Sequence, residues 1–198
     1  MKHRSTANAA PPGAAPEPSI PQKRRLDRLS VREMTVFAML GALMYASKVL
    51  MDLLPNIHLI GVFTVAFSLV YRKKALYPIY TYVFLCGLFA GFSAWWVPHL
   101  YLWLMLWGAV MLLPQDLPKK WRMPVYMGVC SLHGFLYGTL YAPAQALLFG
   151  LSPKGMLAWI VAGLPYDAIH GISNLLCGTL ILPITGILRL AEKNTTSS

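Results

Sequence analysis

Long apolar runs separated by short polar turns dominate the chain from residue 33 onward. Six such runs cover residues 33–53, 57–71, 75–95, 98–114, 123–149 and 155–190. A helix crosses the hydrocarbon core of a bilayer with about 20 apolar residues, so the runs predict membrane-spanning helices. The last run is too long for one straight crossing, and Pro143, Pro153 and Pro165 are expected to interrupt this part of the chain. We expect a fifth span ending near Leu148, a short outer helix over about 154–163 and a sixth span from about Pro165.

The composition supports this interpretation. Only 12% of the residues are charged and 57% are hydrophobic, whereas a soluble domain carries about 25% charged residues. The net charge of +10 does not indicate a nucleic-acid groove, because the basic residues form short clusters between apolar runs. We therefore predict an all-α membrane protein, a six-helix transmembrane bundle over residues 29–192. The three cysteines lie inside apolar runs and lack the spacing of a disulfide framework or a zinc site.

The two ends of the chain differ from the bundle. Residues 1–28 are basic and rich in Pro and Ala, a composition that cannot bury a core. We expect them to form a disordered cytoplasmic tail, and residues 193–198 to form a second, short tail.

The distribution of Lys and Arg predicts the orientation of the bundle. Fifteen of the 17 basic residues fall in the N-terminal tail up to Arg32, in the turns at 72–74 and 119–122, and at the C-terminal end. The other two are Lys48 and Lys154. Because cytoplasmic loops carry the excess of basic residues, both termini should be cytoplasmic, which requires an even number of spans.

A row of small residues marks one face of the first apolar run. Ala38, Ala42 and Ala46 are four residues apart, so they form a smooth stripe on which another helix can pack closely. On spacing alone, packing inside the bundle and docking to another protein are equally good explanations. Similar rows in the third and fifth runs favour packing inside the bundle: Gly87 and Gly91, and Gly134, Gly138 and Ala142.

Polar and aromatic residues gather at the ends of the runs opposite the basic turns. Four of them recur every four residues in the fifth run, and three recur on one face of the last run. Ionisable residues at membrane depth usually face the bundle interior or a cavity, so these stripes predict an outward-open binding pocket. The candidate substrate-binding residues are Trp96, His99, Trp103, Trp107, His133, Tyr137, Tyr141, Gln145, Asp167, His170 and Asn174.

Simpler explanations exist for several of these residues. Trp95 and its neighbours also suit an interfacial aromatic belt, and His133 suits a core histidine with satisfied hydrogen bonds. Lys48 is expected to pair with Asp52, four residues away. Asp167 and His170 favour function, because a carboxylate and an imidazole one turn apart inside a span need each other or a ligand.

The chain contains no motif for hydrolysis or for phosphate binding. Aromatic rings with a few polar groups are typical of a binding pocket, so we expect neither catalysis nor a resident cofactor or metal. Six spans without a visible inverted repeat also make a self-sufficient transporter a poor interpretation. An alternative is an intramembrane enzyme that uses Asp167 and His170 as a proton relay on a lipid or quinone. A third option is a scaffold protein without a ligand.

Over about residues 30–190 the chain resembles the substrate-binding S components of energy-coupling factor (ECF) vitamin transporters of bacteria, in the riboflavin and cobalamin type group. The resemblance is carried by the row Ala38-xxx-Ala42-xxx-Ala46 and by the six-span pattern with both ends inside. The segment Leu164-Pro-Tyr-Asp-Ala-Ile-His-Gly171 is similar to the Pro-Phe-Asn/Asp-x-x-Lys/His-Gly signature of these proteins. Leu54-Pro-Asn-Ile-His-Leu and Tyr71-Arg-Lys-Lys also resemble one clade of the group.

This resemblance implies a plasma-membrane subunit that captures a micronutrient from outside for ATP-driven uptake. Two cytoplasmic ATPases and a transmembrane T subunit would supply the energy, and Ala38, Ala42 and Ala46 would face the T subunit. The pocket would lie in the outer halves of spans four to six. Riboflavin, thiamine, cobalamin, a pterin and a purine-like base all remain candidate ligands, whereas the N-terminus argues against nickel or cobalt ions.

Overall fold

The computed structural model describes residues 29–54 and 57–196, and in these ranges it contains helices and no strand. The predicted all-α fold is therefore confirmed for the described residues. The predicted tail at 1–28, and residues 197–198 of the second tail, lie outside them. The α-helices are α1 (Val31–Met51), α2 (Ile60–Tyr71), α3 (Leu76–Ala90), α4 (His99–Leu112), α5 (Lys119–Phe135), α6 (Tyr137–Phe149), α7 (Pro153–Cys177) and α8 (Ile181–Thr196). Short 3-10 helices cover Arg72–Ala75, Ala94–Trp96 and Gly178–Leu180.

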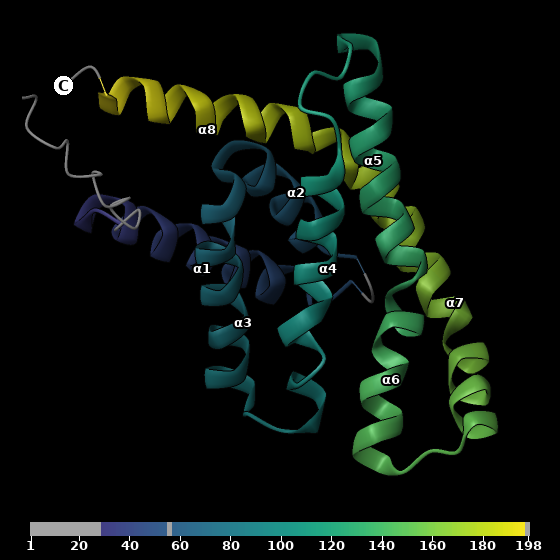
Figure 1. Ribbon diagram of the computed structural model, residues 1–198. Coiled ribbons are helices and arrows are strands. Elements are labelled where there is room, and N and C mark those ends of the chain that lie inside the picture. The colour runs from purple at the N-terminus through teal and green to yellow at the C-terminus, as the bar shows by residue number, and fades with distance from the viewer. Residues whose placement is uncertain (1–28, 55–56, 197–198) are drawn as a thin grey trace, which may run out of the picture.

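Helix α2 forms the centre of the bundle. Its residues from Ile60 to Ser68 are all buried, and it packs against α1, α4, α5, α7 and α8. Because α2 is apolar on every side, all of its faces need an apolar environment, and the neighbouring helices supply it. Figure 1 shows α3, α4, α5 and α6 running up and down the picture, whereas α1 and α8 run across it.

Helix α1 begins at a strong local signal. The Ser30 hydroxyl accepts a hydrogen bond from the Glu33 amide and the Glu33 carboxylate accepts one from the Ser30 amide, which together form a capping box. Glu33 also forms an ion pair with Lys74, at 2.6 Å. Further along, only Phe37, Gly41 and Met44 are buried. Helix α1 therefore touches the bundle, mainly α3, along one narrow stripe.

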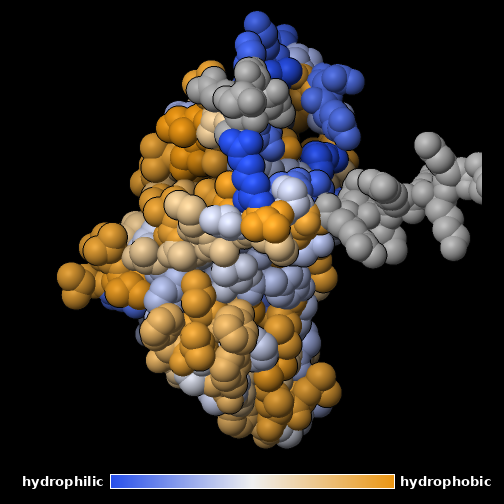
Figure 2. Space-filling view, turned by 90° about the vertical axis from the view of Figure 1, so that its left-hand side faces the viewer, coloured by the Kyte–Doolittle hydropathy of each residue, from blue (hydrophilic) through white to orange (hydrophobic). Residues whose placement is uncertain are grey.

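The surface of the described residues is compatible with a membrane protein. Three stretches are long and apolar enough to cross a bilayer: Val31–Met51, Ala94–Leu112 and Pro153–Lys193. Figure 2 shows one face of the molecule, where apolar side chains cover most of the body and strongly polar side chains gather near one end.

Two expectations about the second half of the chain are wrong. The fifth run is not one helix, because α5 ends at Phe135 and α6 begins at Tyr137, with Leu136 between them. The last run is not interrupted at Pro165, which lies inside α7, and Pro143 likewise lies inside α6. The interruption falls at Gly178–Leu180 instead.

Packing explains these differences. Pro165 removes one backbone hydrogen bond, but α7 remains helical because it lies along both α5 and α6, and neighbouring helices can compensate for such a loss. At Gly178, a β-carbon would come within 2.9 Å of the Met127 side chain on α5. Helix α7 thus ends at a close contact with α5 that local sequence does not reveal.

Candidate functional site

The bend between α5 and α6 brings two rings, those of His133 and Tyr137, together with a ring from α7. His133 lies in the last turn of α5 and Tyr137 begins α6, while His170 is buried in the middle of α7. The ring centres of Tyr137 and His170 are 4.8 Å apart. Trp103 of α4 completes the group, with its ring centre 5.6 Å from that of His133.

His58 joins this group from the connection between α1 and α2. Its ring centre lies 4.6 Å from that of His170 and 6.2 Å from that of Trp103. Burial, followed by the nearby His133, lowers the pKa of His58 to about 4. The imidazole is therefore neutral at physiological pH. His58 was not among the predicted site residues. Its position near Asp52, in a turn on the predicted outer side, is the sequence signal that could have indicated it.

These rings, except that of His133, border a cavity of about 250 Å³. Four of the predicted site residues line it: His99, Trp103, Tyr137 and His170. Tyr82 of α3 also lines it and was missed, because nothing in the spacing of the third run distinguishes it from its aromatic neighbours. The complete lining is Lys48, Met51, Asp52, Leu54, Ile57, His58, Tyr82, His99, Trp103, Tyr137 and His170.

Several buried nitrogen atoms in this cluster lack a hydrogen-bond partner. Among the described residues, His58 Nδ1, Trp103 Nε1, His133 Nδ1 and His170 Nε2 are all buried and unpaired. A buried polar atom without a partner is rare and costs about 1–3 kcal/mol. Three of these atoms belong to residues that line one small cavity, namely His58, Trp103 and His170, and they indicate that a bound molecule completes their hydrogen bonding.

Two of the histidines, His133 and His99, have a defined partner on one ring nitrogen. His133 Nε2 lies 3.0 Å from the Leu102 carbonyl oxygen, so this nitrogen carries the hydrogen and donates. His99 Nδ1 likewise donates to the Trp95 carbonyl oxygen, at 3.1 Å, and His99 Nε2 lies 3.4 Å from the Tyr137 hydroxyl. In the neutral imidazole, the remaining nitrogen is then an acceptor.

The rim of the cavity carries an ion pair. Lys48 Nζ lies 2.9 Å from Asp52 Oδ2, which confirms the predicted pair on α1. Both side chains also line the cavity, and both are partly exposed to solvent.

Other predicted site residues have structural partners away from the cavity. The Asp167 carboxylate accepts a hydrogen bond from the Gly138 amide, at 2.9 Å. Asn174 is fully buried and its side-chain nitrogen donates to the Cys130 carbonyl, at 3.2 Å. These two residues join α7 to α6 and α5 rather than facing the cavity.

The remaining aromatic residues of the prediction also bind backbone atoms. Trp96 Nε1 donates to the Val83 carbonyl at 2.7 Å, and Trp107 Nε1 donates to the Arg72 carbonyl at 3.0 Å. The Tyr141 hydroxyl donates to the Trp95 carbonyl at 3.0 Å, so Tyr141 braces the loop beside the cavity. Gln145 is half-buried on α6 and does not belong to the lining.

The alanine row on α1 is open to the surroundings. Ala38, Ala42 and Ala46 are all exposed, and they lie on a different side of α1 from the buried stripe of Phe37, Gly41 and Met44. No helix of the described chain covers this row.

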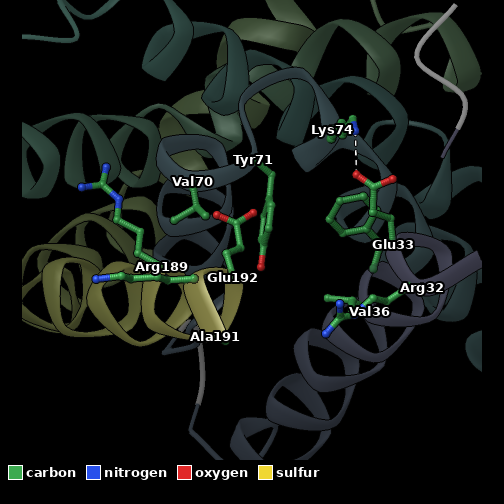
Figure 3. Close-up of a pocket in the computed structure, with 11 residues that line it drawn as sticks. Arg32, Glu33, Val36, Val70, Tyr71, Lys74, Arg189, Ala191 and Glu192 are labelled. Carbon is green, nitrogen blue, oxygen red and sulfur yellow. Dashed lines mark hydrogen bonds and ion pairs between the residues drawn. The ribbon is translucent and has the colours of Figure 1, made fainter. Parts of the chain in front are cut away.

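A second, larger hollow lies at the other end of α1. Its volume is about 760 Å³, and it is bordered by the start of α1, the end of α2 and the end of α8. Figure 3 shows charged side chains around it, including Glu33 with its partner Lys74. Its mixed charges are typical of a solvated surface. The smaller cavity, with its buried unpaired nitrogens, is therefore the stronger candidate for a ligand site.

No group of three or more His, Cys, Asp or Glu side chains in the described part of the chain is arranged to hold a metal ion. In comparisons with known proteins, no family model, no curated protein and no solved structure matches this chain.

Proposed function

We propose that this chain is the membrane-embedded substrate-capture subunit of an ECF-type ABC importer, which binds a vitamin-like micronutrient from outside a bacterial cell. The partners in this proposal are a transmembrane T subunit and two ATPases, which supply the energy. The observation that carries the capture role is the small ring-lined cavity with its unpaired buried nitrogens.

The exposed face of α1 supports the docking part of the proposal. Side chains of Ala38, Ala42 and Ala46 leave the helix backbone accessible, and small residues allow close helix–helix approach in a membrane. Lipid tails gain nothing from such a stripe, whereas a partner helix does. The T subunit is the partner that the resemblance implies.

The proposed topology has six spans and two cytoplasmic termini. The spans would be α1, α2, α3, α4, the bent pair α5–α6, and α7, with α8 continuing on the cytoplasmic side. This arrangement puts the basic residues around α2–α3, α4–α5 and α8 inside. It puts the Lys48–Asp52 pair and the cavity at the outer side, where a ligand arrives.

The enzyme alternative has less support. Asp167 accepts from the Gly138 amide with both carboxylate oxygens, and within the described residues no hydrogen bond joins it to His170. A proton relay needs the two side chains in contact with each other or with one substrate, so we do not propose one.

The capture role is tested by identifying the molecule that purifies with the chain. The full chain, extracted in mild detergent from cells grown in rich medium, should release one small molecule in native mass spectrometry. His170→Phe should lose that molecule while keeping its helical circular dichroism spectrum. A preparation that is empty from every vitamin-rich medium would contradict the capture role.

The docking role is tested by a bulky substitution on α1. Ala42→Trp should abolish uptake and assembly with the energising subunits, while the affinity for the co-purified ligand stays unchanged. Leu43→Trp is the matched control, because Leu43 is also exposed but lies about 100° away around the helix. Equal uptake by the two variants would overturn the docking role.

A further inference from the structure

The cavity also constrains what kind of molecule can enter it. We propose that the part of the ligand held in this cavity is an uncharged one- or two-ring heterocycle that presents a hydrogen-bond acceptor to Trp103. This inference rests on the capture function proposed above and narrows the class of substrate. It is argued from the size, the charge and the hydrogen-bonding atoms of the cavity.

Size is the first constraint. The volume of about 250 Å³ lies below the range of roughly 300–1,000 Å³ in which drug-sized ligands bind. A one- or two-ring molecule fits this space. A corrin does not, and a three-ring flavin would leave part of its structure outside.

The walls favour a flat ring. Tyr82, Trp103 and Tyr137 line the cavity from three different helices, and their ring centres are about 6 Å apart in the pairs Tyr82–Trp103 and Trp103–Tyr137. Aromatic side chains gain most from contact with another π-system, either stacked or edge to face.

Charge is the next constraint. Of the described residues that line the cavity, only Lys48 and Asp52 carry a full charge, and they neutralise each other at the rim. The nearest further carboxylate, Asp167, is bound to the Gly138 amide. An ionic group placed among the buried rings would lose its hydration without gaining a counter-charge, which is costly. The buried part of the ligand is therefore uncharged.

The unpaired nitrogens indicate which hydrogen-bonding groups the ligand carries on its edge. Trp103 Nε1 is a donor only, so the ligand must offer it an acceptor such as a ring nitrogen or a carbonyl oxygen. His58 Nδ1 and His170 Nε2 are adaptable, because a neutral imidazole can present either a donor or an acceptor at a given nitrogen. A heterocycle with both kinds of group on its edge would satisfy all three atoms.

Binding of defined probes to the purified full chain tests this class. Uracil, hypoxanthine and lumazine, kept at slightly acidic pH where they are uncharged, should raise the thermal unfolding temperature in a concentration-dependent way. Orotate, which is uracil with an added carboxylate, should bind at least tenfold more weakly than uracil. Thiamine, a permanent cation, and cobalamin should have no effect at the same concentration.

Two tryptophan variants test the hydrogen bond. Trp103→Phe keeps a ring in place but removes the N–H donor, so the affinity for the best neutral probe should fall about tenfold, as expected for one lost buried hydrogen bond. Trp96→Phe is the matched control, because Trp96 Nε1 is bound to the Val83 carbonyl away from the cavity. This variant should lose thermal stability but keep its affinity.

Each contrary result overturns the inference. Tighter binding of orotate, thiamine or cobalamin than of the neutral probes would contradict the size or charge argument, and binding of no neutral probe would contradict the class as a whole. Unchanged affinity in Trp103→Phe would contradict the acceptor. These failures are distinct from failure of the proposed function, because the Ala42→Trp and Leu43→Trp comparison reports on uptake and assembly without regard to the ligand class.

Discussion

The hydrogen bonds of single residues distinguish side chains that stabilise the bundle from side chains that border the cavity. Trp96, Trp103 and Trp107 occur within one short part of the chain, yet only Trp103 has an unpaired indole nitrogen. The other two donate to backbone carbonyls of α3 and of the α2–α3 connection. Trp96 and Trp107 therefore fix the framework, and Trp103 is the tryptophan available to a ligand.

The close approach of Gly138 and Asp167 leads to the first prediction. A β-carbon at position 138 would lie 2.6 Å from the nearer carboxylate oxygen, so Gly138→Ala should displace Asp167 from the amide that it caps. We expect a loss of about 1–3 kcal/mol in unfolding free energy, the cost of an unpaired buried group. Thermal unfolding in detergent measures this loss.

Gly108→Ala is the control for this variant. Gly108 lies inside α4, and a β-carbon there meets no atom within 4 Å. Its unfolding temperature should stay the same or rise, since alanine favours a helix over glycine. An equal loss in both variants would show that the Asp167 contact is unimportant.

The low pKa of His58 leads to a second prediction. Because the folded chain holds His58 neutral down to about pH 4, the unfolded chain binds the proton more readily as the pH falls below its ordinary value near 6.5. The His58 contribution to stability is therefore complete above pH 6.5 and is lost between pH 6.5 and 4.

Replacing His58 tests this dependence. In His58→Gln, the fall in unfolding temperature between neutral pH and pH 4.5 should be smaller than in the parent chain. An identical pH profile would mean that His58 is not buried in the neutral form.

At this scale the sequence reveals contacts within one helix better than contacts between helices. The Lys48–Asp52 pair follows from spacing alone and is confirmed. The partner of Asp167 is the amide of a residue 29 positions earlier, and the partner of Asn174 is the carbonyl of a residue 44 positions earlier. Such pairs depend on how α7 packs against α5 and α6, which residue spacing does not encode.

At the level of helices, the pair α5–α7 is the tightest part of the bundle near the cavity. A β-carbon on Gly134 would lie 2.9 Å from the Gly171 backbone, so the two helices touch through their main chains. This contact sets the distance between His133 on α5 and His170 on α7. The glycines thereby position two of the rings of the site.

Gly134→Ala should therefore separate α5 and α7. Because backbone atoms cannot rotate out of the way, we expect a loss of about 1–3 kcal/mol in unfolding free energy and weaker binding of the co-purified ligand. Gly128→Ala, on the same helix but with no atom within 4 Å of the added carbon, should change neither. Normal ligand binding in Gly134→Ala would contradict a positioning role for this contact.

The helices themselves follow largely from the apolar runs, whereas their interruptions do not. Helices α1 to α4 occupy the first four runs. Pro165 was expected to begin a new helix and instead lies inside α7, while the interruption falls at Gly178 against Met127 of α5. Proline weakens a helix locally, but contact with neighbouring helices decides whether the helix ends.

At the scale of the whole molecule, several basic residues lie at one end of α1 and the cavity lies at the other end. This arrangement underlies the expected orientation of the protein in the membrane. Arg189 and Lys193 of α8 border the same hollow as Arg32 and Lys74, so basic residues from three distant segments meet at one end. The cavity lies around the other end of α1, beside Lys48 and Asp52. Charge counting assigns these basic residues to the cytoplasmic side, and this orientation stays a prediction.

Accessibility of introduced cysteines tests the orientation. Lys154→Cys, in the first turn of α7, should react with a membrane-impermeant thiol reagent in intact cells. Asp116→Cys, between α4 and α5, should react only after the cells are permeabilised. Both positions are exposed, and the parent chain gives the background from its native cysteines. The opposite pattern would invert the proposed topology.

The enclosure of α2 has a consequence for how the protein is made. Helix α8, which follows α2 only after five further α-helices, covers part of α2, so this central helix cannot be fully wrapped until α8 has been synthesised. Until then, some other molecule, such as lipid or an insertion factor, must shield the uncovered side. Nonsense mutations at the start of α8 should therefore be as damaging as much earlier ones.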